Sequence, residues 1–183
     1  VNFAYLARLI GKSNLYLAET FLRIAWFATP LFFSLLYLLV IYLINKEKEY
    51  KRLSIVVITL SFIISVVTAF SDLVIEGIRF YRDIDLRITY GKGMFPFLGI
   101  ILFFICVSLY PLIKTYLKSS GQLRKRIEYF LFGIFVFYLA NFIFNIVLPI
   151  FFDIVRFYWI GDYSAIFLLG FTSYAIVKHN LFG

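Results

Sequence analysis

The chain has 183 residues, of which 63% are hydrophobic, 22% aromatic and 15% charged, and its formal net charge is +8. A soluble domain of this size could not bury so much apolar surface, and ordinary soluble domains carry about 25% charged residues. The positive charge does not point to nucleic acid either. Basic residues lie in loops beside apolar stretches, where they indicate topology and contact with anionic lipid. We therefore expect a membrane protein and no nucleic-acid partner.

Apolar stretches divide the chain into segments of about the length that crosses a bilayer, for which roughly 20 helical residues are needed. Because a backbone in lipid must satisfy its own hydrogen bonds, we expect these segments to be helices. The predicted fold class is all-α, a polytopic helical membrane bundle within a single domain over 1–183. The five expected spans are approximately 24–44, 53–75, 94–114, 128–152 and 160–178.

Residues 1–22 are only partly apolar, since Arg8, Lys12 and Glu19 interrupt them. We expect the tail of an earlier helix followed by a connecting loop. The chain begins with Val1, and we expect it to be a piece of a longer protein.

Two acidic residues, Asp72 and Glu76, lie at the end of the second predicted span. Their spacing of four places both on one helix face. They are either solvated interface residues or a pair with a ligand-binding role. We keep both interpretations open.

Between the second and third spans, polar and apolar residues alternate from Asp83 to Tyr90, and Gly91 and Gly93 follow. Alternation bounded by glycines is typical of a strand or hairpin. We expect a short extracellular β-ribbon at 83–93, with an irregular loop as the alternative.

The fourth span contains a polar face. Asn141 and Asn145 are four residues apart, with Tyr138 one turn before them and Pro149 one turn after. An amide in lipid needs a partner, so this face should turn toward other helices. It serves either hydrogen bonding between helices or a polar pocket for a ligand. Pro149 cannot donate to the Asn145 carbonyl, so we expect a kink or another donor.

Basic residues set the expected orientation. Short loops with dense basic clusters are typical of the cytoplasmic side. Five spans then place the C-terminus in the cytoplasm and the chain in the cell membrane. The clusters follow the first span, at Lys46, Lys48, Lys51 and Arg52, and the third, at Lys118, Arg124, Lys125 and Arg126.

No catalytic, metal or cofactor site is evident. The one histidine, His179, has no membrane-embedded acid near it in sequence, and the one cysteine, Cys106, is expected to be a buried packing residue. Neither a nucleophile–base pair nor a metal-ligand cluster can be assembled from them. No inverted repeat is visible, and the spans lack deep ionisable residues, which disfavours a transport path.

The closing segment "SYAIVKHNLFG", residues 173–183, resembles the last helix of the seven-helix N-terminal sensor region of bacterial histidine kinases. Shorter stretches resemble that family in the same order along the chain. They are 21–26 before its third helix, 90–95 before its fifth, and 122–133 and 145–149 at the two ends of its sixth. The resemblance implies that one or two helices precede this chain.

The resemblance also implies a sensory input domain that relays a stimulus through its last helix, and a homodimer. The output would leave through Lys178 and His179 toward a cytoplasmic kinase, or toward a cyclic-nucleotide or transcription-activating module of the same chain. No catalytic residue transfers to this region. We expect the stimulus-responsive residues to be Asp72, Glu76, Tyr138, Asn141 and Asn145. The alternative is a stand-alone membrane transporter or an assembly subunit.

Overall fold

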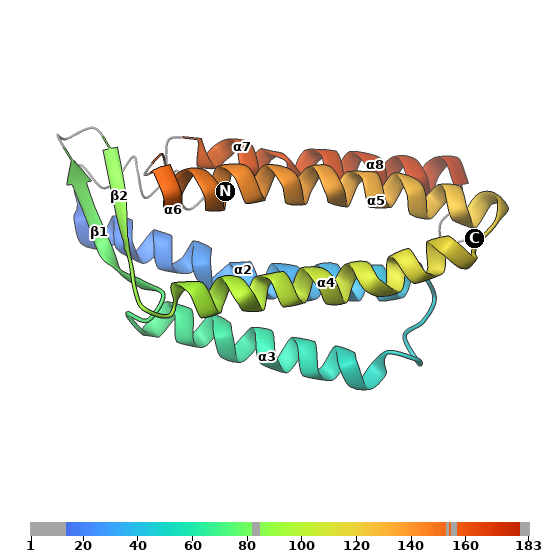
Figure 1. The fold of residues 1–183 in the computed structure, drawn as a ribbon, viewed down its shortest axis with the longest axis horizontal. Coiled ribbons are helices and arrows are strands. Elements are labelled where there is room, and N and C mark those ends of the chain that lie inside the picture. Colours follow the sequence, from blue (N-terminus) through green and yellow to red (C-terminus); the bar gives the residue numbers. More distant parts are fainter. Residues whose placement is uncertain (1–13, 82–84, 153, 155–156, 180–183) are drawn as a thin grey trace. The chain divides into compact units, whose positions relative to one another are not determined.

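The computed structural model describes residues 14–81, 85–152, 154 and 157–179 (Figure 1). The chain forms two compact units, Val1–Pro111 and Leu112–Gly183, and the single domain over 1–183 stays a prediction. In chain order the elements are α2 (Leu15–Leu43), α3 (Lys51–Phe70), β1 (Ile75–Tyr81), β2 (Asp85–Tyr90), α4 (Met94–Lys118), α5 (Gly121–Asn141), the π-helix η1 (Phe142–Val147), α6 (Leu148–Phe152), α7 (Tyr158–Tyr163) and α8 (Ala165–His179).

Helices dominate this structure, as the apolar segments predict. By length and composition, α2, α3, α4 and the continuous stretch Gly121–Phe152 can each cross a membrane. The chain is therefore a multi-pass helical membrane protein, and the predicted fold class is confirmed. The fifth predicted span, 160–178, is not one continuous helix, because α7 ends at Tyr163 and α8 begins at Ala165.

The first spanning helix begins nine residues earlier than the predicted start at residue 24, because α2 starts at Leu15. Its N-cap is Asn14, whose side-chain oxygen accepts a hydrogen bond of 3.0 Å from the Leu17 backbone N–H. An asparagine cap satisfies one of the four free N–H groups at a helix start. The expectation of a connecting loop is therefore wrong for residues 15–22, while residues 1–13 lie outside the described part.

The α2 and α3 helices pack against each other in the first unit. The buried face of α3 consists of small side chains at helical spacing, which lets the two backbones approach closely. That face is Val57, Ser61, Ser65 and Thr68. The buried residues of α2 include larger side chains such as Phe33 and Tyr37.

The second predicted span, 53–75, is too long at its C-terminal end. The α3 helix ends at Phe70, and Ser71 is already extended, with φ of −129° and ψ of 157°. Asp72 lies in the following turn, and Glu76 lies in β1. The two acidic residues therefore do not share a helix face, so the predicted shared face is wrong, while a ligand-binding role for them stays a prediction.

A two-stranded antiparallel hairpin joins α3 to α4 (Figure 1). Ile78 pairs with Ile88, and a β-bulge between Ile75 and Gly77 contains Glu76. The predicted β-ribbon is confirmed as a hairpin, although its first strand precedes the range 83–93 and residues 83 and 84 lie outside the described part. The predicted span extended to residue 75 because residues 73–75 are apolar. These residues instead lead into the first strand, and apolarity alone does not distinguish a helix end from a strand start.

The second unit is built on α5 and α8, which run antiparallel and side by side (Figure 1). Gly133 of α5 lies close to α8, since a β-carbon there would lie 3.1 Å from the Phe171 Cβ. In the turn of α5 before it, the ring centroids of Phe132 and Phe171 are 4.9 Å apart, and those of Tyr129 and Tyr174 are 5.0 Å apart. Edge-to-face contacts of this kind add to the packing of the two helices.

Candidate functional site

The predicted asparagine face does turn toward a neighbouring element. The Asn141 side-chain nitrogen lies 3.1 Å from the Gly161 carbonyl and 3.1 Å from the Ser164 hydroxyl. It also lies 2.9 Å from the Phe137 carbonyl on its own helix. An amide nitrogen has two hydrogens, so it shares them among three acceptors. The expected hydrogen bonding between helices is confirmed, and it joins the end of α5 to the junction of α7 and α8.

The Ser164 hydroxyl completes this junction. Ser164 is buried, accepts from the Asn141 amide and donates to the Gly161 carbonyl one turn earlier. It occupies the single residue between α7 and α8. The break between these two helices is therefore held by hydrogen bonds that come from α5.

Asn145 extends the network by one turn. Its side-chain nitrogen donates to the Asn141 Oδ1 at 2.8 Å and lies 3.3 Å from the Asp162 Oδ1. Both neighbours of this end of the amide are hydrogen-bond acceptors, so this end is the nitrogen. The other end, Oδ1 of Asn145, is buried and accepts no hydrogen bond from any described residue. A buried acceptor left in this state costs about 1–3 kcal/mol.

Gly161 lies directly against that amide. A β-carbon at position 161 would lie 2.5 Å from the Asn145 Oδ1 and 2.7 Å from its Nδ2. No side chain fits there without moving Asn145. The hydrogen bonds of Asn145 described above therefore require glycine at position 161.

The backbone changes register at the same place. The π-helix η1 begins immediately after Asn141, and the Leu148 N–H donates to the Ile143 carbonyl, five residues back. This π-turn lies directly before Pro149 of α6. The helical hydrogen bonds are thus shifted by one residue beside Pro149, and the expected kink or other donor for the Asn145 carbonyl stays a prediction. Single π-turns inside α-helices are frequent at functional sites.

The other predicted residues of this unit lie on α5 and at the end of α8. Tyr138 is half-buried one turn before Asn141, and its ring lies 5.8 Å from that of Phe137. Lys178 and His179 form the last turn of α8, while their side chains and residues 180–183 lie outside the described part. About 20 Å of helix separates the start of α8 from these residues, at about 1.5 Å a residue.

Asp72 belongs to a second polar cluster, in the first unit. The Arg23 guanidinium of α2 lies 2.6 Å from the Asp72 carboxylate and donates to the Ser71 and Ile75 carbonyls at 3.0 and 3.2 Å. Its Nε donates to Glu19 at 2.9 Å. Arg23 thereby ties α2 to the turn that separates α3 from β1. Asp72 is exposed and acts as a structural partner here.

Sequence reasoning missed four residues of these clusters. The spacing of Glu19 and Arg23 is the signal of an ion pair within a helix, but nothing in the sequence connects it with Asp72. Gly161 and Ser164 have no distinctive spacing relative to Asn141. Their role depends on contacts between segments about 20 residues apart.

In comparisons with known proteins, the chain matches no family model, no curated protein and no solved structure. The resemblance to the sensor region of histidine kinases therefore stays a prediction.

Proposed function

We propose that this chain is a membrane-embedded sensory input domain that relays a stimulus through α8 to a cytoplasmic output module. The observation that carries the proposal is the hydrogen-bonded junction of Asn141, Asn145, Gly161 and Ser164 at one end of α8. At the other end of α8 lies the segment that resembles the exit from the sensor region of histidine kinases. One helix thus connects a polar junction in an apolar setting with the predicted output linker.

The junction has properties suited to two alternative packings. The π-turn adds one residue to the helical register, and the Asn145 Oδ1 accepts no hydrogen bond from a described residue. A second packing in which this oxygen gains a hydrogen-bond donor would recover part of the free energy that an unsatisfied buried acceptor costs. A stimulus shifts such an equilibrium only if it binds the two states with different affinity. We infer that rearrangement here moves the start of α8 along or around α5.

The proposal includes the finer features implied by the resemblance. We place the chain in the cell membrane with the C-terminus in the cytoplasm, in a homodimer, and we place any kinase chemistry beyond Gly183. The stimulus-responsive region is assigned to the Asn141 junction. Asp72 and Glu76 belong to the first unit and stay separate candidates for a stimulus-responsive role, and Asp72 is engaged there by Arg23.

The first test is the native gene downstream of the Gly183 codon. A phosphoacceptor histidine followed by an ATP-binding domain would support the input half of a histidine kinase. A different cytoplasmic module would keep the sensor and change its output. A stop codon soon after Gly183 would overturn the proposal, and a stand-alone membrane protein would replace it.

The second test compares two glycine variants in the whole protein. Gly161→Ala places a methyl group against the Asn145 amide, whereas a β-carbon at Gly170 meets nothing within 4 Å. Gly161→Ala should change the basal output activity severalfold, and Gly170→Ala should leave it unchanged. Asn141→Leu should act in the same direction as Gly161→Ala. Equal activity in all three variants and the parent would remove the junction from the signalling path.

A further inference from the structure

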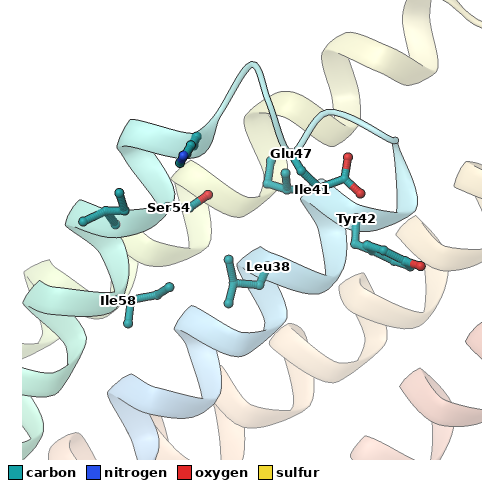
Figure 2. A pocket seen from close by; sticks show the side chains of 8 residues that line it. Leu38, Ile41, Tyr42, Glu47, Ser54 and Ile58 are labelled. Carbon is teal, nitrogen blue, oxygen red and sulfur yellow. The ribbon is translucent and has the colours of Figure 1, made fainter.

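A groove lies between the last turns of α2 and the first turns of α3, next to the loop that joins them. Its cavity volume is about 350 Å³. Figure 2 shows Leu38 of α2 and Ile58 of α3 on opposite sides of it, with Ser54 closer to the connecting loop. The full lining is Leu38, Ile41, Tyr42, Glu47, Lys51, Ser54, Ile55 and Ile58.

The walls of this groove are apolar in effect. Ile55 and Ile58 are 56% and 42% exposed and present only hydrocarbon. The one hydroxyl from the first turn of α3 is already used, because Ser54 donates to the Tyr50 carbonyl at 3.0 Å and lies 3.5 Å from the Tyr37 hydroxyl. A ligand portion seated between the helices would therefore contact alkyl side chains and need no hydrogen bonds of its own.

The rim of the groove is basic. Positions 46–52 hold four basic residues and two acidic ones. Lys46 donates to Glu49 at 2.7 Å, and this hydrogen bond raises the pKa of the lysine. Lys48, Lys51 and Arg52 are exposed and make no ion pair with another described residue, and the first turn of α3 contains no acidic residue. Glu47, which lines the groove, offsets one of these three positive charges, so the charge beside the groove is positive overall.

The apolar walls and the basic rim of the groove lie next to each other near one end of two spanning helices. Both of its helices are long and apolar enough to span a bilayer, and the groove lies beside the loop that connects them. At that level a bilayer changes from acyl chains to headgroups. Basic residues next to spanning helices attract anionic lipid headgroups.

We propose that this groove is a binding site for one anionic phospholipid. An acyl chain lies between Leu38 and Ile58, and the phosphate lies against Lys51 and Arg52. A zwitterionic lipid fits the apolar groove equally well but lacks the net negative charge that the rim would neutralise. This inference is independent of the sensory function proposed above.

The test measures lipid binding to the purified protein by native mass spectrometry, with phosphatidylglycerol and phosphatidylcholine of identical acyl chains. The parent should retain phosphatidylglycerol at lower lipid concentration than phosphatidylcholine. The Lys51→Gln/Arg52→Gln variant should lose about thirtyfold in phosphatidylglycerol affinity and little for phosphatidylcholine, from the usual contribution of each basic residue near an anionic surface. Ile58→Trp, which fills the groove, should weaken both lipids.

The matched control is Lys118→Gln/Lys125→Gln, which removes two exposed basic residues at a different loop. An equal loss of phosphatidylglycerol in this control would overturn the site and leave only diffuse attraction. Equal affinity of the parent for both lipids, or no effect of Ile58→Trp, would also overturn it. So would dimerisation of the parent that Ile58→Trp abolishes, because the groove would then hold a second copy.

A second measurement uses only the parent protein, so its result does not depend on whether a variant folds. Phosphatidylglycerol with a photoreactive group in the acyl chain should crosslink to peptides containing residues 38–58. Phosphatidylcholine with the same tail should crosslink there less at equal concentration. Labelling spread evenly over the apolar faces of all helices would contradict a defined site.

Discussion

Arg23 and Asp72 are joined by an ion pair of 2.6 Å across 49 positions of the chain. The same guanidinium donates to the carbonyls of Ser71 and Ile75, which lie before and after the turn between α3 and β1. One side chain therefore stabilises both ends of this turn. Asp72 is 75% exposed at its side chain, whereas that of Arg23 is 18% exposed. The carbonyl contacts should therefore contribute more to stability than the exposed ion pair does.

This relationship predicts unequal effects of the two partners. Arg23→Gln should lower the free energy of unfolding by about 2 kcal/mol, because bonds from a charged donor to carbonyls are lost. Asp72→Asn should lower it by about 0.5 kcal/mol, as is typical of solvent-screened pairs. The measurement is unfolding by a denaturing detergent in mixed micelles. Arg79→Gln, at an exposed position of β1, is the control. Equal losses for Arg23→Gln and Asp72→Asn would show that the ion pair dominates.

The turn between the hairpin and α4 should require glycine at position 91. A β-carbon on Gly91 would lie 2.3 Å from the Asp72 and Leu73 carbonyl oxygens, so Gly91→Ala should cost about 3 kcal/mol through backbone displacement. A β-carbon on Gly99 of α4 would meet nothing within 4 Å, and Gly99→Ala should be neutral or stabilise by about 1 kcal/mol. Folded yield and thermal stability in detergent measure the difference. Similar values for the two variants would disprove the close approach.

Gly133 should set the separation of α5 and α8. Gly133→Leu pushes a side chain toward Phe171, whereas Gly170→Leu points into open space. Cysteines at positions 129 and 174, in a Cys106→Ser background, replace two rings whose centroids are 5.0 Å apart. A short bifunctional thiol reagent should crosslink them in the parent and after Gly170→Leu, and much less after Gly133→Leu. Undiminished crosslinking in Gly133→Leu would contradict close packing at this glycine.

Cys106 should report whether α4 lies in the bilayer. The sequence favoured a buried packing residue, but its side chain is exposed on α4, and an exposed position in the middle of a span faces lipid. Because the reactive species is the thiolate, a water-soluble maleimide should label Cys106 slowly in vesicles. Ser120→Cys in a Cys106→Ser background, at the exposed loop after α4, should react much faster. Equal rates in vesicles would place this part of α4 in water.

Local patterns in the sequence were sufficient to predict the membrane-spanning helices and the hairpin. A long apolar segment in lipid has to bond its own backbone, so helix follows from composition without reference to any neighbour. Alternation before Gly91 indicated a strand in the same local way. The inward turn of Asn141 followed too, since an amide in lipid requires a partner.

Where α3 ends, and what the polar side chains bind, depended instead on packing between distant segments. Residues 73–75 are apolar enough to continue a helix, yet the carbonyls of Ser71 and Ile75 face Arg23 from another helix. The partners of Asn141 likewise come from Gly161 and Ser164. Apolarity is a local property that each segment carries alone, whereas a hydrogen bond between distant residues exists only after the segments have packed.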